Sequence, residues 1–229
     1  MQNLFTYVDN FFNKVDSNIL QTLNNIENGN ITIDLYMSIN KQDIYGNTLL
    51  HYALGCEKLK SILFLIKLDV KVDILNKNKL SILHILFIKC VKFMKNFDQK
   101  AIAYLEVSKY LINKGANINI KNKNIPSPLN IISVCINNQD SNGNTISHHL
   151  LQFGKLNTLI FLIKNIGINL NIQNNNGRTL LHFAILYSTN NFDKIEIFDF
   201  ILFLLKNGAS EYIKDKNGKY PDDLFGLIH

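Results

Sequence analysis

The strongest constraint on the fold is an eight-residue phrase that the chain repeats. The phrase first occurs as Gly46-Asn47-Thr48-Leu49-Leu50-His51-Tyr52-Ala53, and it returns near the C-terminus as Gly177-Arg178-Thr179-Leu180-Leu181-His182-Phe183-Ala184. A weaker copy, Gly143-Asn144-Thr145-Ile146-Ser147-His148, lies between them. Copies of one phrase at intervals near 33 residues indicate an array of one small helical unit, in which each copy packs on its neighbours.

Six copies of the unit can be aligned on the turn that opens each of them. These turns begin at Asp43, Asn76, Asn122, Asp140, Asn174 and Asp215. Two spacings match the period, because Asp43 and Asn76 are 33 residues apart and Asp140 and Asn174 are 34 residues apart. The longer spacings after Asn76 and Asn174 predict insertions. The spacing of 18 residues between Asn122 and Asp140 is too short for two helices.

The repeated phrase resembles the signature of the ankyrin repeat family, Gly-x-Thr-Pro-Leu-His-x-Ala. The resemblance covers about residues 40–226 and implies an all-α ankyrin-repeat solenoid of stacked helix-turn-helix units with short β-turn fingers. It divides the chain into an N-terminal helical cap with a degenerate half repeat (1–42), ankyrin-like repeats (43–214) and a C-terminal capping repeat (215–229). Within the array we expect the repeats 43–75, 76–121 with an insertion, 122–139 truncated, 140–173, and 174–214 with an insertion.

Local residue choices agree with this division. Most turns combine an opening Asp or Asn, which can close an Asx turn, with a later Gly that tolerates positive φ. In the second repeat Lys79 stands at the glycine position, and the apolar run Phe87–Phe97 predicts an extended first helix. Hydroxyl side chains that can cap the first helix of a repeat stand at Thr48, Ser81, Ser127, Thr145 and Thr179.

Composition favours a protein without a membrane span or a disulfide framework. The start of the chain lacks the pattern of a secretory signal, and no apolar run approaches the roughly 18 residues that a spanning helix needs. The three cysteines, Cys56, Cys90 and Cys135, are widely spaced and read as reduced core residues. We therefore expect a monomer that is cytoplasmic or is delivered into a host cell.

The net charge of +6 and the pI near 9.1 favour acidic partners, but the lysines are scattered and form no basic block. Lys, Asn and Ile are abundant together, and their codons are A/T-rich, so genome bias accounts for much of the charge. By analogy with intracellular microbes and viruses, an effector that engages host proteins is one expectation. Binding of acidic surfaces or nucleic acid through the positive charge stays open as an alternative.

No motif for chemistry stands out, so the sequence predicts no enzyme, no catalytic residues, no cofactor and no metal. The histidines recur once per repeat, which predicts a structural role in each turn rather than a metal cluster; they are His51, His84, His148 and His182. Asp193, Glu196 and Asp199 read as a solvated acidic face of a helix. Phe198, Phe200 and Phe203 read as helix core.

The resemblance also implies where a partner protein binds. In an ankyrin-like array the turn tips and the adjacent helix surface line one concave side, and the residues there determine the partner. Carried over position by position, this surface is Asn-rich and mildly basic, and Tyr45 is its one aromatic residue. Its members are Ile44, Tyr45, Asn47, Lys77, Asn78, Leu80, Lys123, Asn124, Ser141, Asn142, Asn144, Asn175, Asn176, Arg178, Lys216, Asn217 and Lys219. We expect a non-enzymatic protein–protein interaction module that uses this face.

Overall fold

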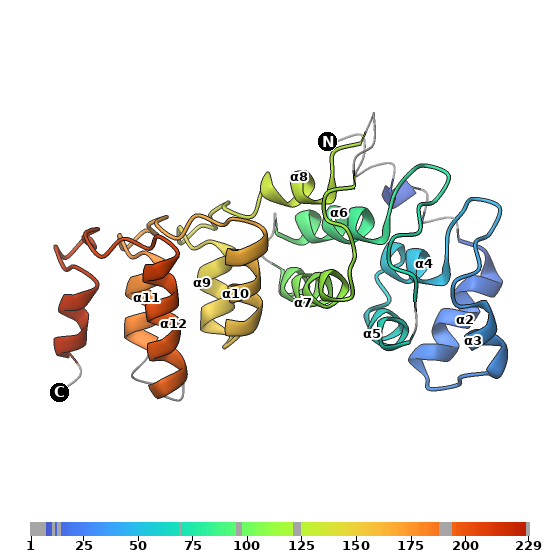
Figure 1. The fold of residues 1–229 in the computed structure, drawn as a ribbon, viewed down its shortest axis with the longest axis horizontal. Coiled ribbons are helices and arrows are strands. Elements are labelled where there is room, and N and C mark those ends of the chain that lie inside the picture. Colours follow the sequence, from blue (N-terminus) through green and yellow to red (C-terminus); the bar gives the residue numbers. More distant parts are fainter. Residues whose placement is uncertain are drawn as a thin grey trace. The chain divides into compact units, whose positions relative to one another are not determined.

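The computed structural model describes residues 8–10, 12, 15–68, 70–94, 98–120, 125–187 and 194–227. Every regular element within these ranges is a helix (Figure 1). This agrees with the expected all-α class. The chain forms two compact units, Met1–Ile132 and Ser133–His229.

The first unit is a stack of helix pairs. It begins with α2 (Ser17–Glu27) and α3 (Ile33–Ser38), followed by the pair α4 (Leu49–Gly55) and α5 (Leu59–Lys67) and by the pair α6 (Ile82–Met94) and α7 (Lys100–Asn113). Helix α4 packs on α5, on α2 and on α6, while α5 packs on α7 and α2. Each pair therefore buries its apolar residues against the pairs before and after it, as a one-dimensional array requires.

The insertion in the second repeat lengthens its first helix, as the sequence predicts. Helix α6 has 13 residues, whereas the corresponding helix α4 has 7. Nearly all of α6 is buried, and Leu86, Phe87 and Cys90 are fully so. Lys89 is also buried, and its Nζ lies 2.7 Å from Asp9 Oδ1 and 3.4 Å from Glu57 Oε1. The two carboxylates compensate the charge that this helix brings into the core.

The truncated third repeat contributes a single short helix to the described residues. Helix α8 spans Pro128–Ser133, and the boundary between the two units falls within it. Residues 134–139 then lead to the next turn without a second helix.

The second unit repeats the plan of the first on a smaller scale. The pair α9 (Ile146–Gln152) and α10 (Leu156–Asn165) precedes the pair α11 (Leu180–Tyr187) and α12 (Lys194–Lys206), and the 3-10 helix η1 (Asp222–Leu227) closes the unit. Helix α11 packs on α9, α12 and η1. In Figure 1 the turns that precede α9, α11 and η1 lie along the same end of these helices.

The aromatic residues of α12 differ from the expectation of a uniform core stripe. Phe200 is buried, but Phe198 is 54 % exposed, so the prediction for Phe198 is wrong. The buried side of the helix carries Ile197, Phe200, Ile201 and Leu204, and Phe198 lies off that side. Glu196 and Asp199 are exposed, as expected of a solvated acidic face, and Asp193 lies outside the described residues.

Candidate functional site

The candidate site is built on five turns that share one hydrogen-bond pattern. In the first, Asp43 Oδ1 accepts the backbone N–H groups of Tyr45 and Asn47 at 2.9 and 2.8 Å. The side chain thereby closes the Asx turn that the sequence predicts. The same two bonds, to the residues two and four positions later, are made by Oδ1 of Asn76, Asp140, Asn174 and Asp215.

Two features favour glycine at positions 46, 143 and 177 of the turns, a positive φ and a close approach of the next repeat. Gly177 has φ +74°, a conformation that costs little only for glycine, and a Cβ at this position would lie 2.6 Å from the backbone N of Lys216 in the next repeat. Gly143 is constrained in the same way by Asn175. In the second repeat Lys79 adopts φ +63° without being glycine, so this turn is strained.

Backbone hydrogen bonds join each turn to the next. Within the first unit, Lys77 N–H donates to the Tyr45 carbonyl at 2.9 Å. Within the second unit, Asn175 N–H donates to the Asn142 carbonyl and Lys216 N–H to the Asn176 carbonyl, both at 2.9 Å. The tips of successive turns are therefore held side by side and form one continuous surface in each unit.

Glutamines immediately before three turns strengthen this connection, and the sequence analysis missed them. The Gln42 Nε2 donates to its own turn at the Gly46 carbonyl (2.7 Å) and to the Leu75 carbonyl of the next repeat (3.1 Å). Gln139 and Gln173 make the corresponding pairs of bonds. The signal available in the sequence was the recurrence of Gln before Asp or Asn at positions 42, 139 and 173.

Three residues expected on the binding surface are buried, and for them the surface prediction is wrong. Asn47 and Leu80 are each 1 % exposed, and Asn144 is 8 % exposed. The amides join neighbouring repeats, since Asn76 Nδ2 donates to Asn47 Oδ1 at 3.0 Å and Asn174 Nδ2 donates to Asn144 Oδ1 at 2.9 Å. The position after the turn glycine therefore faces the next repeat, and its side chain cannot contact a partner on the surface.

Arg178 occupies the same position and also differs from its expected role as a solvated turn-tip residue. Its side chain is 31 % exposed, and its Nε lies 3.7 Å from Oδ2 of the buried Asp215 in the capping repeat. Burial would raise the pKa of Asp215, but the backbone N–H groups of Lys219 and Asn217 and the Arg178 charge lower it below its ordinary value. Arg178 therefore contributes to the fold.

The remaining predicted residues are exposed at the turn tips. In the first unit they combine an apolar group, Ile44 (74 % exposed) and Tyr45 (49 % exposed), with Lys77 and Asn78. In the second unit they are polar or basic: Ser141, Asn142, Asn175, Asn176, Lys216, Asn217 and Lys219. Lys123 and Asn124 lie outside the described residues. We call the first set the unit 1 tip surface and the second the unit 2 tip surface.

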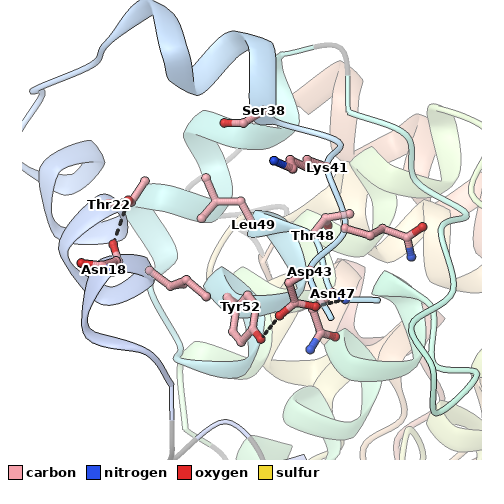
Figure 2. Close-up of a pocket in the computed structure, with 11 residues that line it drawn as sticks. Asn18, Thr22, Ser38, Lys41, Asp43, Asn47, Thr48, Leu49 and Tyr52 are labelled. Atoms are coloured by element: carbon pink, nitrogen blue, oxygen red, sulfur yellow. Dashed lines mark hydrogen bonds between the residues drawn. The ribbon is translucent and has the colours of Figure 1, made fainter. Parts of the chain in front are cut away.

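A pocket of about 280 Å³ opens beside the unit 1 tip surface (Figure 2). Helices α2 and α4 and the first turn supply most of its lining. Figure 2 shows the Tyr52 hydroxyl directed at Asp43 on one side, with Ser38 and Lys41 on the opposite side and Leu49 between them. Burial, together with the hydrogen bond to Asp43, raises the pKa of Tyr52 to about 12, so its hydroxyl is protonated at neutral pH.

The four repeat histidines are core residues that cap helices. In each repeat the backbone N–H of the capping Thr or Ser donates to Nδ1 of the histidine three positions later, at 3.1 Å for Thr48 and His51. Nδ1 is therefore an acceptor, and the neutral ring carries its proton on Nε2. In His182 the Nε2 lies 3.3 Å from the Lys219 carbonyl of the next repeat. The corresponding bonds at Nδ1 are made in His84, His148 and His182.

Burial lowers the pKa of these histidines. Desolvation brings the pKa of His51, His84 and His148 to about 4, and it lowers that of His182 as well. These rings are neutral in the folded protein at physiological pH. Over the described ranges, no three His, Cys, Asp or Glu side chains come together in the manner of a metal site.

The cysteines lie mainly in the core. Cys90 and Cys135 are buried, and Cys56 is partly buried, with its Sγ 3.8 Å from the Phe12 carbonyl. Burial raises the pKa of the Cys56 thiol, which favours the less reactive protonated form. None of the described helices is long and apolar enough to cross a membrane.

The chain matches a family model described as ankyrin repeats in three copies, over residues 129–217. No curated protein matches it. One solved structure similar to it is an ankyrin repeat protein, at 17 % identity over 91 % of this chain and 90 % of that one, with a TM-score of 0.42.

Two further solved structures are similar to the chain. One is a predatory endopeptidase from Bdellovibrio bacteriovorus in complex with an immunity protein, at 22 % identity over 94 % of this chain and 93 % of that one (TM-score 0.36). The other is an ankyrin repeat domain from Acinetobacter baumannii AYE, at 21 % identity over 92 % and 88 % (TM-score 0.39).

The family match and the local geometry agree on the same repeating unit. Matched residues 129–217 include two of the five Asx turns and two of the four buried histidine caps, and the first unit repeats both features outside the match. Residues 129–217 match the ankyrin repeat family, and the described part of the chain is an all-α array of helix-turn-helix units.

Proposed function

We propose that the chain is a non-enzymatic interaction module that binds an acidic segment of a partner protein through its turn-tip surfaces. The observation that carries this proposal is how the turns use their charged residues. The turn carboxylates of Asp43, Asp140 and Asp215 are occupied by backbone N–H groups of their own turns. Lys77, in the turn opened by Asn76, and Lys216 and Lys219, in the turn opened by Asp215, are exposed. The lysines therefore extend from the tips, whereas the carboxylates keep their negative charge but point back into their turns.

The unit 1 tip surface is the better candidate for the centre of the contact. It carries Ile44 and Tyr45 next to Lys77, because the Lys77 backbone bonds that of Tyr45. Tyrosine is enriched among the residues that dominate binding energy, since it buries a large area with little loss of conformational entropy. The unit 2 tip surface is rich in Asn and Lys and fits a polar rim of the interface.

A pull-down from candidate host cytosol followed by mass spectrometry tests the proposal. The Tyr45→Ala, Lys77→Glu double variant should lose the partner, whereas Lys60→Glu, which changes the charge of an exposed lysine on α5, should retain it. The captured protein must also bind the purified wild-type chain. If both variants retained the partner equally, the turn tips would not be its binding site.

The alternative of a nucleic-acid or polyanion binder is favoured by the net charge of +6 alone. It predicts an affinity that falls steeply with salt, because each phosphate contact releases counterions. A titration with single- and double-stranded DNA and RNA at two salt concentrations separates the two functions. Delivery into a host cell as an effector is a finer hypothesis, supported by the A/T-rich residue choice, and a host-cell binding partner would support it further.

A further inference from the structure

Large apolar side chains stand exposed near the end of the second unit. Phe198 and Leu202 of α12 are 54 % and 50 % exposed, and Tyr212, in the loop after α12, is 79 % exposed. We propose that these three residues, which we call the α12 end surface, bind an amphipathic helix of a partner protein. They are not part of the tip surfaces, so this inference goes beyond the proposed function and does not rest on it.

The exposed residues of α12 share one side of the helix. Phe198, Leu202 and the partly buried Leu205 are spaced by four and three residues, which places them in one row. Phe203 marks the side that faces the preceding pair of helices, because Nζ of Lys164 in α10 lies 5.5 Å from the centre of its ring. The row lies roughly 100–160° away from Phe203 around the helix. It is therefore directed away from α10.

One half of the joint beside this row is already an interface. Helix η1 packs on α11, and Figure 1 shows η1 on the opposite side of the α11–α12 pair from α9 and α10. The described part of the cap repeat, which runs to Leu227, supplies η1 as its one helix. The α12 end surface therefore continues the interface between α11 and η1, on the half of the joint that belongs to the second helix of the repeat.

The preceding repeat shows this position covered. Helices α10 and α12 can be aligned on Leu162 and Leu204, because the carbonyl of each accepts the backbone N–H five residues later. In this alignment Leu156 corresponds to Phe198, and Leu156 is only 3 % exposed. In the first unit the second helices of successive repeats pack on each other, since α5 contacts α7. A helix is thus what the array itself places beside the second helix of a repeat.

Tyr212 stands where earlier repeats bind their successor. The residue three positions before a turn-opening residue accepts a backbone N–H from the loop of the next repeat, as Asn171 Oδ1 does from Ser210 at 2.8 Å. Asn137 does the same with Asn169, and in the first unit the corresponding acceptors are Asn40 and Asp73. Before Asp215 this position holds an exposed aromatic residue instead of Asn or Asp. A capping repeat normally has a polar outer face, so a large apolar group here indicates binding rather than shielding.

A partner's helix fits this surface better than a second copy of the chain. Asp199 is exposed directly after Phe198, near the middle of the row. A two-fold axis that paired the row with itself would bring the Asp199 carboxylates of both copies close together. Like charges in such a contact are unfavourable. A helix with apolar residues at i, i+3, i+4 and i+7 covers the same row without this repulsion.

Charges of both signs surround the α12 end surface. Asp215 is paired with Arg178, and the side chain of Lys194 lies outside those described. The other charged residues of α12, the loop after it and the cap repeat are Glu196, Asp199, Lys206, Glu211, Lys214, Lys216, Lys219, Asp222 and Asp223. Neither sign dominates, so the apolar row and Tyr212 select the partner by its apolar side rather than by its charge.

Two labelled synthetic peptides test the proposal by fluorescence anisotropy. Each is about 18 residues long, so that an isolated helix can form in water, and both have the same composition of Ala, Glu, Lys and Leu. The stripe peptide carries its leucines at i, i+3, i+4 and i+7, whereas the control peptide distributes them around the helix. We expect the stripe peptide to bind at least about tenfold more tightly, because burial of even one leucine side chain contributes that much to affinity.

Variants of the full chain locate the contact. The double variant Phe198→Ser, Leu202→Ser should lose the preference for the stripe peptide, while its thermal melt stays close to wild type because both side chains are half exposed. Leu63→Ser, at a leucine of α5 that is 43 % exposed, is the matched control and should keep the preference. Tyr212→Ala tests the same surface from outside the helix and should weaken binding of the stripe peptide severalfold.

The opposite results would overturn the proposal. Equal affinity for the two peptides, or binding of neither, would show that the surface does not take an apolar helix. A preference that survives both the double variant and Tyr212→Ala would place the contact elsewhere. Light scattering of the chain alone should give a monomer, and a dimer that the double variant abolishes would assign the surface to a second copy. The proposed acidic-partner surface would stand in each case, because it uses other residues.

Discussion

Arg178 Nε lies 3.7 Å from Asp215 Oδ2, across the joint between the last long repeat and the capping repeat. At the same position in two earlier joints, Asn47 meets Asn76 and Asn144 meets Asn174 through hydrogen bonds between their amides. The residue after the turn glycine is thus paired with the residue that opens the next turn. An amide is matched with an amide, and the cation is matched with a carboxylate.

The Arg178–Asp215 pair should contribute to stability. Arg178→Ala leaves the buried Asp215 carboxylate with its two backbone N–H groups but without the cation, and we expect a loss of about 1 kcal/mol in the free energy of unfolding. Urea denaturation of the two single variants, Arg178→Ala and Asp215→Asn, and of the double variant measures the coupling. Additive effects of the two substitutions would show that the pair does not interact.

The turn glycines should differ in their tolerance of alanine. At both Gly177 and Gly218 alanine must adopt a positive φ, which costs roughly 1–2 kcal/mol. At Gly177 the new Cβ also meets the Lys216 backbone, whereas at Gly218 it has no heavy atom within 4 Å among the atoms described. Gly177→Ala should therefore lower the free energy of unfolding by at least about 1 kcal/mol more than Gly218→Ala. Equal losses in denaturation experiments would refute the close packing of the turns.

Lys79→Gly should stabilise the protein. Lys79 has φ +63°, and glycine relieves about 1–2 kcal/mol of strain while losing about 0.5–1 kcal/mol through its greater freedom in the unfolded chain. The expected net gain is between about 0 and 1.5 kcal/mol. Glu57, with φ +58°, serves as the control. Glu57→Gly relieves the same backbone strain but also removes ion pairs with Lys89, Lys92 and Lys100, so it should stabilise the protein less than Lys79→Gly does. A lower melting temperature for Lys79→Gly would contradict this prediction.

Acid should unfold the protein through its buried histidines. The pKa of His51, His84 and His148 is about 4 in the folded state against about 6.5 when unfolded, so the unfolded chain binds more protons between these values. The stability that these rings contribute is complete above pH 6.5 and is lost as the pH falls towards 4. The slope is up to about 1.4 kcal/mol per pH unit for each ring.

Replacing one ring should reduce this slope. Asn130 stands at the histidine position of the truncated repeat, so the chain itself uses asparagine there, and its N–H bonds Ser127 Oγ at 3.3 Å. His51→Asn should lower stability at pH 7. Between pH 6 and 4.5 it should also reduce the slope of the free energy of unfolding against pH by the contribution of about one proton, roughly 1.4 kcal/mol per pH unit. Urea titrations across this range measure it, and an unchanged slope would show that His51 is not one of the titrating groups.

Helix α8 should be the least protected helix of the array. It has six residues and lies at the boundary of the two units, so it has little stacking area of its own. Its amide hydrogens should exchange faster than those of α6 and α9. Uniform protection across all three helices in native-state hydrogen exchange would contradict the assignment of residues 122–139 as a truncated repeat.

The sequence predicts this fold well because the residues within each repeat determine the local structure of that repeat. Turn glycine, capping Thr and buried His follow one another within seven residues in Gly46–Tyr52, and each has a local physical reason. The extension of α6 could likewise be predicted, since an apolar run continues past the length of a standard helix.

The binding surface was harder to predict because exposure depends on the neighbouring repeat. The period assigns Asn47, Leu80, Asn144 and Arg178 to a turn, but whether such a residue is covered depends on what the next repeat places against it. The amide pairs and the Arg178–Asp215 pair each join residues at least 29 positions apart, so no local pattern indicates them. The Phe198 error has the same origin, because periodicity alone does not show which side of α12 the preceding helix covers.

The pairing across the joints also limits where further repeats can be added to this array. A tandem duplication of residues 174–214 would place Arg178 of the first copy against Asn174 of the second, where an amide replaces the carboxylate of Asp215. The guanidinium would then enter the joint with no counter-charge. New repeats can be inserted with less damage at a joint of two asparagines, such as the one between Asn144 and Asn174. The joint at Arg178 is therefore specific for a following repeat that opens with a carboxylate, as Asp215 does.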